Sequence, residues 1–244
     1  MNNLPTVTKN LLIINVLCFF GAFVAEERFG LNLNDILGLH FFMASDFKLF
    51  QLITYMFMHA DMYHIFFNMF AVWMFGRTLE QVMGSKRFLT YYMICGIGAG
   101  LVQEIVQYVE YLVLSSSMPS DVVTLISQEG AEILKSHMNY VDKSMAALNS
   151  VINGSCVGAS GSVFGLLLAF GMLFPNSQMF VFPIPFPIKA KFFVIGYAVI
   201  ELFSGLGASG DGIAHFAHLG GMIFGFFLIL YWRKKNNNNG QFYY

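Results

Sequence analysis

Long apolar stretches separated by short polar segments dominate the chain, and their lengths are the first guide to its fold. A helix that crosses the apolar part of a bilayer needs about 20 mostly apolar residues. The candidate stretches lie at about residues 7–25, 62–76, 88–112, 157–174, 192–208 and 212–232. The pattern therefore predicts an all-α membrane protein, with a bundle of six transmembrane helices over residues 1–235.

Charged residues distinguish these stretches from one another. The last contains no Asp, Glu, Lys or Arg and is the clearest, whereas Glu104 and Glu110 interrupt the third and Glu201 interrupts the fifth. The first is followed by three charged residues at 26–28 rather than by a small-residue cleavage site. We therefore expect it to be a retained helix and not a secretory signal.

Two further segments are not expected to cross the membrane. Residues 29–50 are too apolar for an ordinary loop, so this outer loop is predicted to lie partly in the membrane interface. Residues 115–155 form an insertion in which apolar side chains recur at spacings of four and three, the pattern of an amphipathic helix. These side chains are Leu134, Met138, Val141, Met145, Leu148 and Ile152. We expect this helix to cover the protein or lie on the bilayer surface; binding a partner is the alternative.

Two segments are expected to have no helix. Residues 182–187 contain three prolines, which predicts a stiff extended connector between the fourth and fifth helices. Residues 236–244 form a polar tail that is expected to be disordered.

Composition agrees with a chain that faces lipid. It is 57% hydrophobic and 11% charged, whereas soluble domains carry roughly 25% charged residues. The net charge of -1 gives no indication of a nucleic-acid partner. The three cysteines fit neither a disulfide framework nor a zinc site, and no cofactor is indicated.

Basic residues orient the bundle. With the N-terminus in the cytoplasm and six crossings, nine basic residues fall inside and four outside, which is the asymmetry of the positive-inside rule. The inner set is Lys9, Arg77, Lys86, Arg87, Lys189, Lys191, Arg233, Lys234 and Lys235. The outer set is Arg28, Lys48, Lys135 and Lys143. Both termini are therefore predicted to be cytoplasmic.

The first candidate for chemistry is Ser160, between Gly158 and Gly161 at the start of a predicted helix. Glycines allow a sharp turn and close approach of a substrate. The free N–H groups of a helix N-terminus stabilise negative charge beside the serine. Gly161 and Gly165 also form a G-x-x-x-G pair, so a small-residue surface for helix packing is the simpler explanation of this motif alone.

The second candidate is His218, with His215 one turn earlier in the last predicted helix. Histidine inside a membrane is costly without a partner and is a functional candidate by default. Gly221 and Gly225 form another G-x-x-x-G pair. If the fourth and sixth helices pack through their small residues, a neutral His218 reaches Ser160 as its general base.

The third candidate is the pair His64 and Asn68, four residues apart on one face of the second predicted helix. Together they offer two donors to a developing oxyanion. A helix–helix hydrogen bond is the simpler explanation of this pair alone. All of these residues belong near the outer ends of their helices. No carboxylate is expected to complete a triad, because Asp211 falls at the surface.

Taken together, these motifs resemble the rhomboid intramembrane proteases, and in particular the bacterial type. The resemblance is carried by His64-x-x-x-Asn68, Gly158-x-Ser160-Gly161 and Ala217-His218-x-x-Gly221-x-x-x-Gly225, in this order and on one side of the membrane. Two positions differ from the common pattern. Phe164 stands where a tyrosine commonly stacks on the histidine, and Phe50-Gln51 stand where many members have Trp-Arg.

The resemblance implies a Ser160–His218 dyad, with the Ser160 amide, His64 and Asn68 as the oxyanion hole. It also implies Gly158, Gly161, Phe164, His215, Gly221 and Gly225 as supporting residues. Such enzymes cut transmembrane proteins near the outer boundary of the cell (inner) membrane and need no metal or cofactor. The expected partners are transmembrane substrates and the lipid bilayer; the sequence does not define an oligomeric state.

Three alternatives follow from other combinations of residues. An ion-coupled transporter would use Glu104 and Glu201 with the histidines as a proton relay. A non-catalytic rhomboid relative that binds membrane proteins would be expected to lack Ser160 or His218. A metal-dependent protease would use the histidines, but no H-E-x-x-H occurs and no carboxylate is spaced for metal binding beside them.

Overall fold

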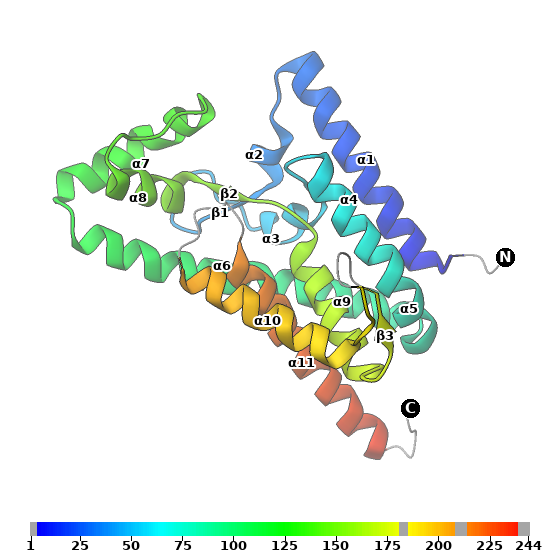
Figure 1. Cartoon of the computed structure of the whole chain (residues 1–244). Helices are drawn as coiled ribbons and strands as arrows, with labels where there is room; N and C mark the ends of the chain where they lie inside the picture. The colour runs from blue at the N-terminus through cyan, green and yellow to red at the C-terminus, as the bar shows by residue number, and fades with distance from the viewer. Residues whose placement is uncertain (1–3, 181–184, 208–213, 239–244) are drawn as a thin grey trace.

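The computed structural model describes residues 4–180, 185–207 and 214–238 and is mostly helical (Figure 1). The larger helices are α1 (Thr6–Phe29), α6 (Ser85–Ser116), α9 (Ser160–Leu173), α10 (Ala190–Leu206) and α11 (His215–Asn238). The shorter ones are α2 (Leu33–Leu37), α3 (Gln51–Thr54), a 3-10 turn (Tyr55–Phe57), α4 (Met62–Ala71), α5 (Arg77–Met83), α7 (Ser120–Lys135) and α8 (Lys143–Asn153). A π-helical turn (Val72–Gly76) joins α4 to α5.

Three of the described helices are long and apolar enough to cross a membrane. They are α1, α6 and the His215–Lys235 part of α11. Helix α9 is equally apolar in character but has only 14 residues. The chain is therefore a mostly helical membrane protein, as predicted.

The centre of the fold is the packing of α6, α9 and α11. A Cβ added to Gly221 of α11 would collide with the carbonyl oxygen of Gly161 in α9. Tyr91 of α6 donates its hydroxyl to the carbonyl of Gly165 at 2.8 Å. Small residues at these positions let the backbones approach closely. The prediction that the fourth and sixth helices meet through their small residues is confirmed.

Glu80 of α5 fixes the first turn of α1. Its carboxylate accepts the backbone N–H groups of Val7 at 3.0 Å and Thr8 at 2.7 Å. It also accepts the hydroxyls of Thr8 at 2.7 Å and Ser85 at 2.6 Å. The first N–H groups of a helix have no partner within the helix, and a carboxylate there is favoured by the helix dipole. This contact joins α1 to the turn between α5 and α6.

The insertion forms two helices rather than one. Helix α7 ends at Lys135 and α8 begins at Lys143, where Asp142 accepts the N–H groups of Ser144 and Met145. The expected single amphipathic helix is wrong, because the apolar spacing continues across a turn. Ile126, Leu148 and Ile152 are buried with partly buried side chains that include Tyr111 and Leu114 of α6. The hairpin thus covers one end of α6 (Figure 1).

The outer loop is attached to the end of this hairpin. Strand β1 (Leu39–His40) pairs antiparallel with β2 (Ser155–Cys156). Gln51 is 1% exposed; its amide oxygen accepts the N–H groups of His40 and Lys48, and its amide nitrogen donates to Ile36 and Asp46 carbonyls. Gln51 therefore anchors the outer loop.

The remaining strands, β3 (Gln178–Met179) and β4 (Ile188–Lys189), pair between α9 and α10. Much of the predicted proline-rich connector, and Asp211, lie outside the described residues. Helix α11 continues to Asn238, three residues into the predicted tail, so that part of the tail prediction is wrong.

Candidate active site

Ser160 is the first residue of α9, directly after a tight turn. Gly158 has φ +133°, a backbone conformation that side chains rarely adopt, and its N–H donates to the carbonyl of Tyr55 at 2.9 Å. A Cβ on Gly158 would lie only 2.7 Å from His64 Nε2. Glycine is therefore required here by the turn and by the neighbouring ring. The turn leaves Ser160 beside the free N–H groups at the start of α9.

His218 of α11 is brought to Ser160. Its Nε2 lies 2.9 Å from Ser160 Oγ, which is hydrogen-bonding distance. The Phe164 ring stacks on the imidazole, with centroids 4.2 Å apart and planes 6° apart. The stacking that the resemblance implied is therefore present with phenylalanine in place of tyrosine. The pair has the geometry of a hydroxyl and its general base.

Glu201 of α10 is a site residue that sequence reasoning missed. It is 6% exposed, and its Oε2 lies 2.9 Å from His218 Nδ1 and 2.7 Å from His215 Nδ1. Spacing along the chain indicated no carboxylate beside these histidines, but folding brings Glu201 to both of them. A charge inside a membrane helix requires a partner. That rule was the available signal, but it did not identify which histidines meet Glu201.

His64 of α4 lies against the Gly158 turn. Asp61 caps α4 by accepting the His64 N–H at 2.8 Å. The Ala60 N–H points to His64 Nδ1 at 3.4 Å, which makes Nδ1 an acceptor and leaves the ring hydrogen on Nε2. That Nε2–H faces Gly158, next to Ser160. His64 is thus placed as a donor at the nucleophile.

Asn68 is buried one turn further along α4. Its amide donates to the His64 carbonyl at 3.0 Å, so one of its two N–H groups is occupied within the helix. Among the described contacts Asn68 has none with Ser160. The structure therefore brings His64, Ser160 and His218 to one place and leaves Asn68 at the edge of it.

His59 supports the loop before α4. Its ring lies edge-on to His64, with centroids 5.1 Å apart. Burial, and then the neighbouring His64, lower the pKa of His59 to about 4. His59 is consequently neutral at physiological pH and places no positive charge beside His64.

Glu201, His215 and His218 also form a set of potential metal ligands. One ligand atom from each lies within 4.8 Å of the other two. The nitrogen–oxygen distances of 2.7 and 2.9 Å, however, are those of direct hydrogen bonds. An ion bound at about 2.0–2.2 Å from each atom would have to separate them and replace these bonds. The present geometry is that of a hydrogen-bonded network.

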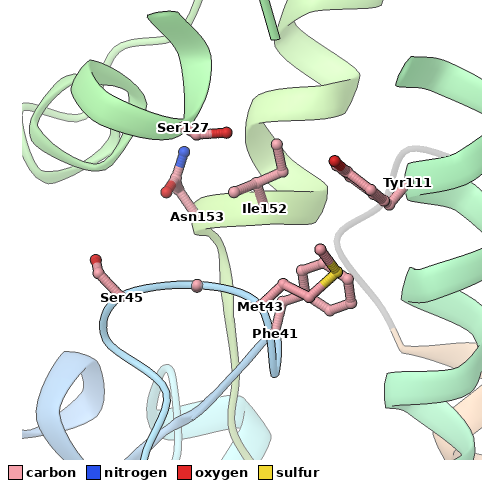
Figure 2. A pocket seen from close by; sticks show the side chains of 8 residues that line it. Phe41, Met43, Ser45, Tyr111, Ser127, Ile152 and Asn153 are labelled. Atoms are coloured by element: carbon pink, nitrogen blue, oxygen red, sulfur yellow. The ribbon is translucent and has the colours of Figure 1, made fainter. Parts of the chain in front are cut away.

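A separate hollow lies between the outer loop and the insertion, away from Ser160 (Figure 2). Its walls come from the loop at 41–45, Tyr111 of α6, Ser127 of α7, and Ile152 and Asn153 of α8. Its volume of about 80 Å³ is small beside the roughly 300–1,000 Å³ of ligand pockets. We interpret it as a packing gap between two surface elements.

Comparison with known proteins agrees with this architecture. The family model described as the Rhomboid domain matches residues 46–235. The chain is 28% identical over 171 residues to "Rhomboid protein 1, mitochondrial" of Saccharomyces cerevisiae. That alignment covers 69% of this chain and 38% of the yeast protein, so the chain corresponds to well under half of that relative. The match over residues 46–235 shows that this chain belongs to the rhomboid family.

Proposed function

We propose that this protein is an intramembrane serine endopeptidase that cleaves transmembrane proteins, with Ser160 as nucleophile and His218 as general base. The observation that carries this proposal is the 2.9 Å contact of Ser160 Oγ with His218 Nε2 at the start of α9. Membership of a family that includes intramembrane proteases supports the same reaction.

The reaction follows from the two groups. Ser160 Oγ bonds to the carbonyl carbon of the scissile peptide while its proton passes to His218 Nε2, and the carbonyl π electrons move onto oxygen. The intermediate collapses as the C–N bond breaks, and the proton on His218 goes to the leaving amine. Water then attacks the ester, His218 accepts its proton, and that proton returns to Ser160 Oγ.

The oxyanion of each intermediate needs donors opposite the nucleophile. We assign this role to the Ser160 N–H, His64 Nε2–H and the second N–H of Asn68. The tautomer of His64 and its position at Gly158 support its part, while Asn68 would have to aim its remaining N–H at the substrate. Preorganised donors of this kind act where charge develops in the transition state.

The depth of the site supports cleavage within the membrane. A helix of 14 residues is about 21 Å long, which is shorter than the roughly 30 Å apolar core of a bilayer. If α9 ends at the cytoplasmic boundary, Ser160 lies below the outer surface. Water must then reach it from outside, and substrates are cut near the outer boundary.

We further propose the bacterial-type arrangement of six crossings in the inner membrane, with both termini cytoplasmic. Figure 1 shows the first turn of α1, α5 and β3 toward one side and α2, β1, α7 and α8 toward the other. The crossings beyond the three longest helices would be supplied by α4 together with the π-helical turn Val72–Gly76, by α9 and by α10. The distribution of basic residues supports this orientation.

The direct test is labelling of the purified protein with a fluorophosphonate probe, which reacts with an activated serine. Wild type should be labelled and should cleave a transmembrane reporter in proteoliposomes, and Ser160→Ala should do neither. Cleavage by Ser160→Ala would contradict the assignment. Folded wild type that neither reacts nor cleaves would favour a non-catalytic binder. Solute flux in the same liposomes would favour a transporter. Loss of cleavage when a chelator is added would favour a metal-dependent protease.

A further inference from the structure

Glu201 has no role in a two-residue mechanism, yet it contacts the proposed base directly. Its Oε2 lies 2.9 Å from Nδ1 of His218, the nitrogen opposite the one that faces Ser160. The carboxylate is buried in a mostly apolar helix, where a charge is costly without compensation. Its placement on this nitrogen therefore calls for a chemical explanation.

An ionised carboxylate can only accept hydrogen bonds. Both Nδ1 atoms within 2.9 Å of Oε2, those of His215 and His218, must then carry hydrogen. A neutral His218 with hydrogen on Nδ1 has its lone pair on Nε2, which faces the Ser160 hydroxyl. The carboxylate thereby selects the one neutral tautomer that can accept the serine proton.

We propose that Glu201 is a positioning residue that orients His218 and stabilises its protonated form, giving a Ser160–His218–Glu201 arrangement. This inference rests on the proposed function. When the Ser160 proton moves to Nε2, the imidazolium charge forms 2.9 Å from the carboxylate. Glu201 stays ionised throughout: it accepts a hydrogen bond and takes no proton.

Helix α10 restrains the imidazole in two ways. Phe164 stacks on His218 and in turn contacts Tyr197 of α10, with centroids 5.3 Å apart. Stacking fixes the plane of the ring but not its rotation within that plane. Glu201, one helical turn after Tyr197, fixes that rotation through Nδ1. The ring is therefore held by its face and by both nitrogens.

His215 shares the carboxylate and completes its environment. It lies one turn before His218 on α11 and donates to the same oxygen at 2.7 Å. Two N–H donors compensate a buried charge better than one. The other titratable groups that face this network are His64 of α4 and Tyr197 of α10. The simpler alternative is that Glu201 only joins α10 to α11.

The test compares Glu201→Gln with wild type in proteoliposomes. Gln keeps the size but not the charge, so kcat should fall about 10²–10⁴-fold, as when the carboxylate of a serine-protease triad is removed. KM should stay within about threefold, because substrate binding is not touched. The acid limb of kcat/KM against pH should move to lower pH, because the neighbouring negative charge is lost. Glu201→Asp should retain more activity than Glu201→Gln.

Glu110→Gln is the matched control, since it makes the same change on an exposed side of α6 and should leave kcat unchanged. A Glu201→Gln enzyme with unchanged kcat and pH profile would overturn the inference while leaving Ser160 chemistry intact. Cleavage by Ser160→Ala at the wild-type rate would instead overturn the proposed function.

A second measurement is made on the wild-type protein and needs a variant only to assign the His218 signal. Nitrogen NMR of ¹⁵N-histidine wild type, assigned with His218→Gln, should find the His218 hydrogen on Nδ1 at neutral pH. A hydrogen on Nε2 would overturn the inference.

Discussion

Glu80 and Glu201 are both buried carboxylates, but their surroundings differ. Glu80 accepts from two backbone N–H groups and two hydroxyls, none of which titrates near neutral pH. Glu201 accepts from two imidazoles, one of which touches Ser160. Permanent donors thus make a carboxylate a structural clamp, whereas donors that gain and lose protons couple it to chemistry.

The comparison is tested most strongly at His218. His218→Ala should abolish cleavage and fluorophosphonate labelling, because Ser160 loses its base. Its melting temperature in detergent should fall but the protein should still fold, because Glu201 loses one of its two donors and Phe164 loses its stacking partner while the Glu80 contacts stay intact. Residual cleavage above that of Ser160→Ala would contradict the role of His218.

The oxyanion donors should give the next largest effect. His64→Ala or Asn68→Ala should lower kcat about 10²–10³-fold, the usual cost of losing one donor. Kinetics with the same reporter measure this loss. An unchanged kcat in Asn68→Ala would show that its bond to the His64 carbonyl is its whole role.

Close packing around the site should be sensitive to one methyl group. Gly221→Ala places a Cβ against the Gly161 carbonyl, and overpacking typically costs about 1–3 kcal/mol. Melting temperature and kcat should both fall. Gly196→Ala in α10 is the matched control, because nothing lies within 4 Å of a Cβ added there. Equal behaviour of the two variants would contradict the close approach of α9 and α11.

Glu80 should affect stability and not chemistry. Burial tends to raise the pKa of Glu80, but its hydrogen bonds from Ser85, Thr8 and Val7 hold it below the usual value. Its contribution is therefore complete above the unfolded pKa of about 4.3 and is lost as pH falls through the lower folded value.

Glu80→Gln should thus lower the free energy of unfolding by about 1–3 kcal/mol at pH 7. The difference from wild type should shrink as the pH is lowered below about 4. Thermal melting in detergent across this range measures it, and kcat of the folded variant should match wild type. A difference independent of pH would show that the charge of Glu80 is not what stabilises α1.

Sequence motifs predicted much of the candidate site because they are local. Each motif lies within a few consecutive residues: Ser160 with its glycines, and His218 with Gly221. The small residues on the two helices indicated that these helices meet. Glu201 could not be paired in the same way. Its partner depends on how α10 is rotated against α11, which tertiary packing determines.

Other features were missed for related reasons. Strands β1 and β2 have two residues each, too few for an alternating pattern. The break between α7 and α8 was hidden because both helices bury apolar side chains in one cluster with compatible spacing. Gln51 is a single polar residue whose four hydrogen-bond partners lie 3 to 15 residues earlier in the irregular outer loop, so no periodic pattern marks it as an anchor.

The β1–β2 pair has a mechanical consequence. Only residues 157–159 separate β2 from Ser160, and α8 ends at Asn153, just before β2. Three residues extend over at most about 11 Å, so a pull on the α7–α8 hairpin would reach the Gly158 turn with little slack. The pairing of Leu39 with Cys156 and of His40 with Ser155 attaches the segment between α8 and Ser160 to the outer loop that Gln51 anchors. Forces on the exposed hairpin are thereby diverted into the loop before they displace the nucleophile.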